Sequence, residues 1–493
     1  MFDKTEGCVL AVDIGSSSVK GALFSTSCRL IPDTFFALEH KQTNSFDGGV
    51  EENPLYIQKI VENVIDKIVN QINKKDYEIL AVAIDSMASS VSGLNKLNDP
   101  VTPFYTYADT RNSYDVEKIK ESINELEVHQ RTGTMQHTSY LPARIMWIKR
   151  TKPELYTQIS KWVDIPTFLF MRWFEFEKVK TSYCLASWSG LVDRFNRRWD
   201  ESILNLLDMD KNYFPELSTW DDSIQILNKE YSKRWKLLRN IPFFLGVGDG
   251  LSANLGTGCV DPSNLAITIG STGAMRTILP GNPKIPLGLW SYCFGKDKNI
   301  LGGSFTEGGN VIKWANDNLG LDTSSGLDKI LNGRAPDIHG LTVLPFLSGE
   351  RSTGWNGAAT ASISGIRMST SSTDILQALC ESIAHRFSDV LDLILPYLDK
   401  DLNIVASGGA LSESKWWLKT ISNSLGRPIM VCDLDQQTLY GTSKLALKGI
   451  GVIGNFEEIP VEKSDIIYPD YKAIEIMNVA RLKHKDFYNS LFG

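Results

Sequence analysis

Two segments of this 493-residue chain carry side chains that could act on a polyphosphate and on a hydroxyl group. In the first, Asp13-Ile14-Gly15-Ser16-Ser17-Ser18-Val19-Lys20, a carboxylate at the end of an apolar run precedes a turn of small residues. Such a turn exposes backbone N–H groups and hydroxyls to phosphate oxygens, and the carboxylate can hold a hydrated magnesium ion. The segment therefore indicates a nucleotide phosphate site; the alternative is an ordinary hairpin with a polar turn.

The second segment places one carboxylate, Asp249, between Gly248 and Gly250 near the middle of the chain. A carboxylate on a turn at a mid-chain hinge can face the cleft between two domains, where a general base for a sugar hydroxyl would act. The alternative is an N-cap aspartate at the start of a small-residue helix. The two roles can hold together, so Asp249 is the candidate general base.

Two other nucleotide-binding patterns do not fit the first segment. Its turn lacks the GxxxxGK[ST] spacing of a Walker P-loop, and no GxGxxG sequence follows its strand. A P-loop fold and a dinucleotide-binding fold are therefore both disfavoured.

The elements that must position Asp13 are strands and one helix. Apolar runs at 8–12 and 19–24 predict strands on either side of the first turn. Residues 54–72 have apolar side chains at helical spacing, with proline in the first turn. The run at 79–84 lacks polar alternation, which is typical of a buried parallel strand.

A second block of the sequence resembles the first. A predicted strand at 265–269 ends at Gly270-Ser271-Thr272-Gly273, and a return strand follows at 274–278. A later strand at 403–406 runs into Ser407-Gly408-Gly409-Ala410. Because the two hairpins lie about half the chain apart, we predict a duplicated α/β domain.

Length and composition set wider limits. A chain of 493 residues suits two domains, and 42% hydrophobic and 22% charged residues are ordinary globular values. A net charge of −7 disfavours nucleic-acid and membrane partners, and no basic-apolar leader or membrane-length apolar run is present. The seven cysteines include no CxxC pair, so we expect core thiols in a reducing cytoplasm. A homodimer remains possible.

Taken in order, these segments resemble the FGGY family of carbohydrate kinases almost from end to end. The two hairpins resemble the family's phosphate hairpins, and 248–250 resembles its catalytic-base segment. The other matching segments are Gly302-Gly303 with Glu307-Gly308-Gly309 and Trp314, Leu344-Pro345-Phe346-Leu347-Ser348-Gly349-Glu350-Arg351 with Trp355-Asn356, and the Ser407–Ala410 loop.

The resemblance implies an α/β fold of two actin-like, ribonuclease H-like ATPase domains with a cleft between them. Residues 1–258 would hold the polyol and the first phosphate hairpin, and residues 259–493 would bind ATP. The family's chemistry implies ATP and Mg²⁺, with Asp249 as the base that accepts the proton of a primary hydroxyl during phosphoryl transfer.

The resemblance also implies individual contacts. The implied nucleotide contacts are Asp13, Gly15, Ser16, Ser17, Ser18, Lys20, Gly270, Ser271, Thr272, Gly308, Gly309, Gly408 and Gly409. The implied magnesium ligands are Asp13 and Asp249. The implied substrate contacts are Met87, Asp109, Arg111 and Asp249.

Within the family, the sequence is most similar to gluconate kinases. The segment Tyr107-Ala108-Asp109-Thr110-Arg111 resembles their substrate segment, and 131–147 and 182–187 follow their spacing. Gluconate carries a carboxylate, which guanidinium groups bind bidentately. Arg111 is the first candidate for that contact and Arg144 the second; the alternative for both is a structural ion pair.

Three departures from the family pattern keep other substrates open. Ser86-Met87-Ala88-Ser89 stands where many members have Met-His, Tyr107 replaces a common tryptophan, and 351–355 lacks a usual proline. A kinase for a pentulose, a hexulose or glycerol is one alternative. A nucleotide-dependent sensor without turnover is another, although Asp13 and Asp249 are both retained.

Overall fold

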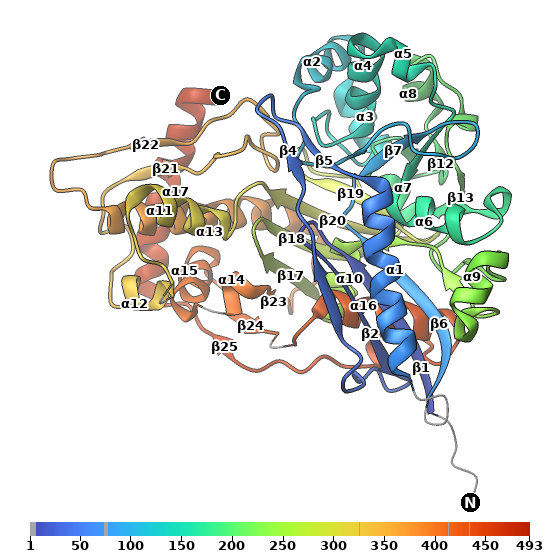
Figure 1. Ribbon diagram of the computed structural model, residues 1–493. Coiled ribbons are helices and arrows are strands. Elements are labelled where there is room, and N and C mark those ends of the chain that lie inside the picture. The colour runs from blue at the N-terminus through green and yellow to red at the C-terminus, as the bar shows by residue number, and fades with distance from the viewer. Residues whose placement is uncertain (1–5, 73–76, 325, 413, 433) are drawn as a thin grey trace, which may run out of the picture.

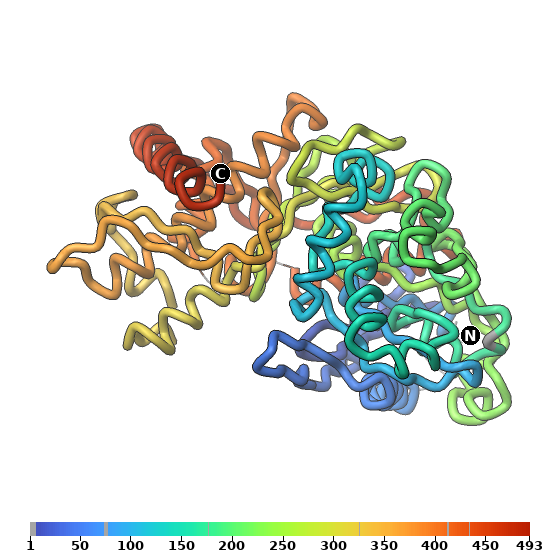
Figure 2. Tube along the Cα trace, turned by 90° about the horizontal axis from the view of Figure 1, so that it is seen from above, coloured from blue at the N-terminus to red at the C-terminus, as the bar shows by residue number. Residues whose placement is uncertain are grey.

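The computed structural model describes residues 6–72, 77–324, 326–412, 414–432 and 434–493. These residues form two lobes (Figures 1 and 2). The first half of the chain lies mainly in the right-hand lobe of Figure 1, and the second half lies mainly in the left-hand lobe. The predicted α/β fold is confirmed, since each lobe is built on a mixed sheet with helices packed against it.

The first sheet contains the predicted strands around the first turn. Its strands, in spatial order, are β14 (Ser223–Ile224), β15 (Phe243–Phe244), β6 (Tyr77–Ser86), β1 (Glu6–Ile14), β2 (Ser18–Ser25) and β3 (Phe36–Glu39), with β16 (Val247–Gly248) also paired to β6. Strand β1 runs antiparallel to β2 and parallel to β6. The turn between β1 and β2 therefore lies at the same sheet edge as the end of β6.

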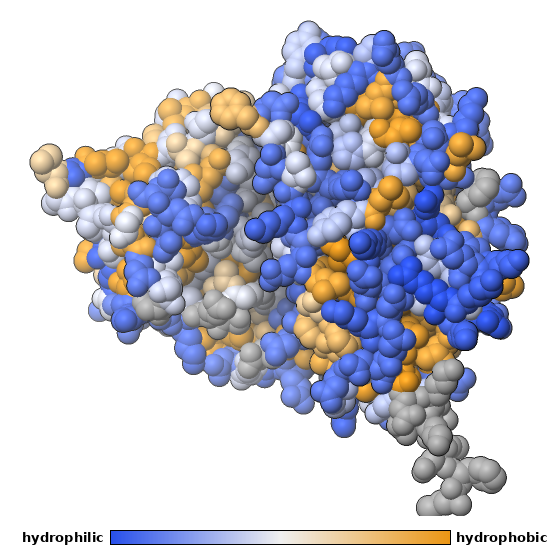
Figure 3. Space-filling view, in the orientation of Figure 1, coloured by the Kyte–Doolittle hydropathy of each residue, from blue (hydrophilic) through white to orange (hydrophobic). Residues whose placement is uncertain are grey.

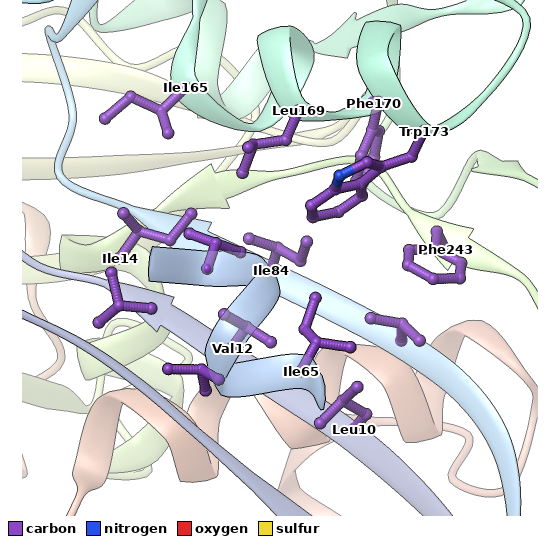
Figure 4. Close-up of a cluster of buried hydrophobic side chains, with 14 of the residues drawn as sticks. Leu10, Val12, Ile14, Ile65, Ile84, Ile165, Leu169, Phe170, Trp173 and Phe243 are labelled. Atoms are coloured by element: carbon purple, nitrogen blue, oxygen red, sulfur yellow. The ribbon is translucent and has the colours of Figure 1, made fainter. Parts of the chain in front are cut away.

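Helices α1 (Pro54–Gln71) and α6 (Ile165–Trp173) cover one face of this sheet. Asn53 caps α1 by accepting a 3.0 Å hydrogen bond from the backbone N–H of Tyr56, and Pro54 lies in the first turn as expected. Strand and helix side chains pack together in the core of Figure 4: Leu10, Val12, Ile14, Ile65, Ile84, Ile165, Leu169, Phe170, Trp173 and Phe243. Burial of this apolar surface fixes the strands that carry Asp13.

The second sheet repeats the same unit. Its strands, in spatial order, are β19 (Trp290–Phe294), β20 (Lys298–Phe305), β18 (Gly273–Pro280), β17 (Asn264–Ile269), β23 (Asn403–Ser407), β24 (Ile429–Val431) and β25 (Ile466–Ile467). Strand β17 runs antiparallel to β18 and parallel to β23, as β1 does with β2 and β6. The predicted duplication is thus present in the strand order.

Helices pack against this sheet to form the second core. They are α11 (Asn310–Leu319), α13 (Ser372–Ile394), α15 (Lys415–Leu425) and α17 (Tyr471–Phe492). The long helix α13 begins with a capping box formed by Ser371 and Asp374. A hairpin of β21 (Thr342–Leu344) and β22 (Ser362–Ser364) projects beside α17.

Two short helices join the halves. α10 (Asp249–Gly256) follows the first sheet, and α16 (Gln437–Gly449), from the second half, packs against α10 and β1. Their backbones touch at glycines, because a Cβ on Gly256 would lie 1.9 Å from the carbonyl oxygen of Gln437. A Cβ on Gly441 would lie 1.8 Å from the carbonyl oxygen of Ser252, so neither glycine can carry a side chain in this packing.

The first half also carries a smaller region above the sheet in Figure 1. It contains the sheet β4 (Thr43–Asn44), β5 (Val50–Glu52), β8 (Phe104–Tyr105), β7 (Val91–Leu94) and β9 (Lys161–Asp164) and the helices α2 (Ser113–Ser122), α3 (Glu125–Thr132) and α4 (Leu141–Thr151). This region contacts the second half through a 2.8 Å hydrogen bond between the Tyr140 and Tyr292 hydroxyls. The ring of His129 also lies 2.8 Å from the carbonyl oxygen of Leu289.

The surface carries few unusual features. No helix within the described ranges is long and apolar enough to cross a membrane. All seven cysteine side chains are buried, as expected for core thiols. In Figure 3 hydrophilic residues cover much of the right-hand lobe, and hydrophobic residues gather at the upper left near β21, β22 and α17.

Candidate active site

The first predicted phosphate hairpin lies at the end of β1. Across the hairpin, Asp13 is the partner of Lys20 in register, and the backbone N–H of Gly15 donates to the carbonyl oxygen of Ser18 at 3.0 Å. The ring Nε2 of His40 lies 2.9 Å from the carbonyl oxygen of Gly15. Ser16 and Ser17 are exposed at the tip, so their hydroxyls and N–H groups are accessible to a ligand.

Asp13 has a partner that the sequence analysis missed. Asp85, at the end of β6, lies opposite Asp13 in the parallel register, and the two carboxyls hydrogen-bond. Burial and the charge of Asp13 raise the pKa of Asp85 well above its ordinary range, which makes Asp85 the partner that holds the proton. The Thr442 hydroxyl from α16 donates to Asp85 and ties this pair to the second half.

Asp249 is the first residue of α10 and lies near this pair. Its Oδ1 accepts a 2.7 Å hydrogen bond from the backbone N–H of Gly250. Burial, followed by the charge of Asp13, raises the pKa of Asp249 to about 6, while Arg276 and Arg351 oppose the rise. A carboxyl with this pKa is ionised at neutral pH and basic enough to accept a proton from a hydroxyl in a transition state.

The second predicted hairpin joins β17 to β18. Its turn is closed by a 3.0 Å hydrogen bond from the N–H of Gly270 to the carbonyl oxygen of Thr272, and Gly270 and Ser271 are exposed. Gly308 and Gly309 pack directly on this turn. A Cβ on Gly308 would lie 2.6 Å from the carbonyl carbon of Thr272, and one on Gly309 would lie 2.8 Å from the carbonyl oxygen of Gly270. Only glycine permits this approach.

The loop after β23 approaches the same turn. Gly408 has a φ of +101°, and a Cβ there would lie 2.5 Å from the carbonyl oxygen of Ile269. A Cβ on Gly409, which begins α14 (Gly409–Ser412), would meet no described atom within 4 Å. The structure therefore brings three sequence-predicted nucleotide segments together: the turn at 270–272 and the glycine pairs Gly308-Gly309 and Gly408-Gly409.

A cavity of about 240 Å³ connects Asp249 with this phosphate turn. Its lining residues come from both halves of the chain: Ala88, Ser89, Tyr107, Trp188, Asp249, Gly250, Ala253, Thr268, Gly270, Thr272, Gly273, Ala274, Arg276, Ser304, Arg351 and Thr438. A larger groove of about 840 Å³ shares Tyr107, Thr272 and Arg351 with the cavity. The cavity thus has the size of a site for a small polyol, with the groove as its opening.

Of the four predicted substrate contacts, Asp249 lines the cavity and Arg111 lines the larger groove, whereas Met87 and Asp109 line neither. Met87 packs in the core of the first sheet, while its neighbours Ala88 and Ser89 line the cavity. Asp109 is fully buried, and its carboxylate accepts hydrogen bonds from Arg111 and forms a 2.8 Å ion pair with Arg144. Their roles as substrate contacts stay predictions.

The carboxylates of Asp13 and Asp249 are suitable ligands for Mg²⁺. Asp13 lies close enough to Asp249 for its charge to raise the pKa of Asp249, and Asp249 lines the cavity together with Gly270 and Thr272. Mg²⁺ is typically held by one or two carboxylates plus phosphates. Within the described residues, no three His, Cys, Asp or Glu side chains are grouped to hold a metal ion alone. A nucleotide phosphate would therefore have to complete the coordination.

Comparisons with known proteins agree with this geometry. The chain is 26% identical over 486 residues to the gluconokinase of Bacillus subtilis, covering 96% of this chain and 93% of that protein. Among solved structures, the Lactobacillus acidophilus gluconate kinase has a TM-score of 0.90 at 24% identity and covers 99% of this chain and 98% of its own. The xylulose kinase of the same organism also has a TM-score of 0.90 at 24% identity, over 98% of each chain.

Both domains of a single family match the sequence. The N-terminal domain of the FGGY family of carbohydrate kinases matches residues 8–256, and the C-terminal domain of that family matches residues 266–449. These two matches span most of the chain, which therefore belongs to the FGGY family of carbohydrate kinases.

Proposed function

We propose that this carbohydrate kinase transfers the γ-phosphate of ATP to a primary hydroxyl of gluconate. One observation carries the chemistry: Asp249 and the phosphate turn at 270–272 line the same small cavity. The similarity to gluconokinases supports the choice of substrate.

In this reaction Asp249 accepts the proton of the hydroxyl while the oxygen attacks the γ-phosphorus. The exposed serines at the tips of the two turns, Ser16, Ser17 and Ser271, would offer N–H and hydroxyl groups to the phosphate oxygens. Bound Mg²⁺, held through Asp13 and Asp249, would offset charge on the phosphates. Positioning and electrostatics supply most of the acceleration in phosphoryl transfer.

We also propose which half of the chain binds each substrate. Residues 1–258 bind the polyol and carry the first hairpin, and residues 259–493 bind the nucleotide through the glycine pairs Gly308-Gly309 and Gly408-Gly409. A cytoplasmic location and a homodimer stay predictions.

A coupled ADP-release assay across gluconate, pentuloses, hexuloses and glycerol tests the proposal. We expect the highest kcat/KM with gluconate and a requirement for Mg²⁺. Activity on another sugar, with none on gluconate, would refute the substrate and leave the kinase chemistry standing. No sugar-dependent ADP release in any arm would favour the sensor alternative.

A kinase for another sugar is the second candidate. Ala88 lines the cavity where many family members have histidine, so a usual polar contact to the substrate is missing. The chain is 23% identical over 485 residues to the xylulose kinase of Lactococcus lactis, so a pentulose is one of the sugars to be assayed.

A further inference from the structure

The two arginines expected to bind a substrate carboxylate already have carboxylate partners. The guanidinium of Arg111 donates to both Asp109 and Glu51. The guanidinium of Arg144 is almost fully buried, pairs with Asp109 and donates to the carbonyl oxygens of Thr106, Asp109 and Thr138. Neither lines the small cavity. A buried, satisfied ion pair offers little to a further anion.

The cavity itself holds two other arginines, Arg276 and Arg351. Asp249 is the single carboxylate among its described lining residues, and Asp13, whose charge raises the pKa of Asp249, is not among them. Two guanidinium groups that line one small cavity favour an anionic ligand there.

Arg276 is buried on β18 and held in one orientation. Its Nε donates to Oδ1 of Asn254 on α10 at 2.9 Å, and its Nη2 donates to the hydroxyl of Thr268 on β17 at 3.0 Å. Nη1 makes no hydrogen bond with the described residues and lies at the cavity wall, 3.4 Å from where a Cβ on Gly250 would be. A fixed guanidinium with one free edge is pre-organised to bind an anion.

Arg351 also lines the cavity, and its side chain makes no hydrogen bond with the described residues. Its guanidinium lies 5.4 Å from the ring centroid of Tyr107, and its Nε is buried without a partner. The neighbouring residue Glu350 fixes the loop, because it is buried, pairs with Arg386 and accepts a 2.6 Å hydrogen bond from the Tyr488 hydroxyl. The loop is thus anchored while the arginine beside it is left unsatisfied.

We propose that Arg276 and Arg351 form the site that binds the substrate's carboxylate, and that they select sugar acids over neutral sugars. The inference rests on the proposed function. The free Nη1 of Arg276 and the guanidinium of Arg351 each donate to the carboxylate, while Asp249 faces the hydroxyl that is phosphorylated. Both arginines come from the second half, so the sugar acid contacts the half that is proposed to bind ATP.

The competing role for these cations is binding of the transferred phosphoryl group. A phosphoryl role would lower kcat equally for every substrate and weaken ATP binding. A carboxylate role weakens gluconate binding in the absence of nucleotide and leaves ATP affinity unchanged. The two roles are therefore separable by binding measurements alone.

The test is calorimetric titration of gluconate, and separately of ATP, into the full-length wild type and the Arg276→Gln and Arg351→Gln variants. Arg194→Gln is the matched control, since Arg194 is also a buried arginine but donates to the backbone carbonyls of Gln130 and Pro283. We expect gluconate affinity to fall at least tenfold in each cavity variant and less than threefold in the control. Thermal unfolding of each protein reports whether the fold is retained. If Arg276→Gln fails to fold, Arg276→Lys is titrated in its place.

Gluconate affinity within threefold of wild type in both cavity variants would overturn the inference. So would an equal loss of ATP affinity. If the wild type phosphorylates gluconate and the variants do so equally well, only this inference fails. If the wild type neither binds nor phosphorylates gluconate but turns over a neutral sugar, the proposed function fails first.

Discussion

The two sheets share one topology but differ in the charge of equivalent residues. In the first sheet, Asp13 on β1 lies opposite Asp85 on β6. In the second sheet, the equivalent residues are Thr268 on β17 and Ser407 on β23, whose hydroxyls lie 3.3 Å apart. A buried carboxyl pair in one half is thus a hydroxyl pair in the other.

The helices and return strands show the same contrast. α10 begins with Asp249, whereas α16 begins with Gln437. One cation has the reverse distribution. Arg276 on β18 lies opposite Ala266 on β17, whereas Ala22 on β2 lies opposite Ala11 on β1; two residues away, Lys20 on β2 has Ala274 as its counterpart on β18. The duplicated scaffold therefore places Asp249 in the first half and Arg276 in the second, and both line the cavity between the halves.

The largest expected effect comes from removing the carboxylate of Asp249, the proposed general base. Asp249→Asn should lower kcat by about 10²–10⁴-fold, because an amide cannot accept the proton of the hydroxyl. ATP affinity, measured by calorimetry, should stay near that of the wild type. Gln437→Asn at the start of α16 is the matched control and should keep nearly full activity. Wild-type turnover by the Asp249 variant would remove this residue from the mechanism.

The next effect tests the carboxyl pair. Asp85→Ser introduces the residue that the second half has at this position. It should lower kcat/KM by about 10–100-fold, as expected for loss of a group that orients the proposed metal ligand Asp13. Asp85→Asn keeps a hydrogen-bond donor toward Asp13 and should retain most activity. Magnesium titrations of both variants should show a raised Mg²⁺ requirement in the serine variant alone. Equal losses in the two variants would mean that the acid itself is needed.

A smaller effect concerns the turns after β6 and β23. By register, Met87 and Gly409 are equivalent, and a Cβ on Gly409 would meet no described atom within 4 Å. Gly409→Met should therefore fold normally and weaken ATP binding about tenfold by blocking close approach of the nucleotide. Gly408 is a poor site for this test, since its φ of +101° strains any side chain. Gluconate affinity should hold, and loss of gluconate affinity with ATP binding intact would contradict the assignment of the halves.

Features set by neighbouring residues could be predicted from the sequence, whereas contacts between residues far apart in the chain could not. The hairpins, their strands and Asp249 could be predicted because apolar runs and small-residue turns are local signals. Asp85 carried such a signal too, as a carboxylate at the end of a predicted parallel strand. The Thr442 partner of Asp85 lies 357 residues away, and nothing in the sequence pairs them.

The arginines show the same limit. Arg111 lies in the segment that resembles the family's substrate segment, and Arg144 lies in a stretch that follows the family's spacing. Their pairing with Glu51 and Asp109 depends on how β5 and α4 pack. Arg276 lies in the second hairpin, and no sequence pattern indicated that its side chain would line the cavity. Its exposure to the cavity follows from the register of β18 and from its contact with α10.

The smallest expected effect is a shift in the pH dependence of the reaction. With a pKa of about 6, Asp249 is ionised above that pH and protonated below it, so kcat/KM should be full at neutral pH and fall as the pH drops through 6. The positive charge of Arg276 lowers the pKa of Asp249, so Arg276→Gln should move this acid limb to higher pH. The measurement is kcat/KM for the best substrate from pH 5 to 8, with each profile scaled to its own plateau so that weaker binding does not hide the shift. Arg194→Gln should leave the limb in place, because Arg194 does not line the cavity. A limb that stays fixed in the Arg276 variant would show that a group other than Asp249 titrates, and the second half would then supply no electrostatic control over the base of the first.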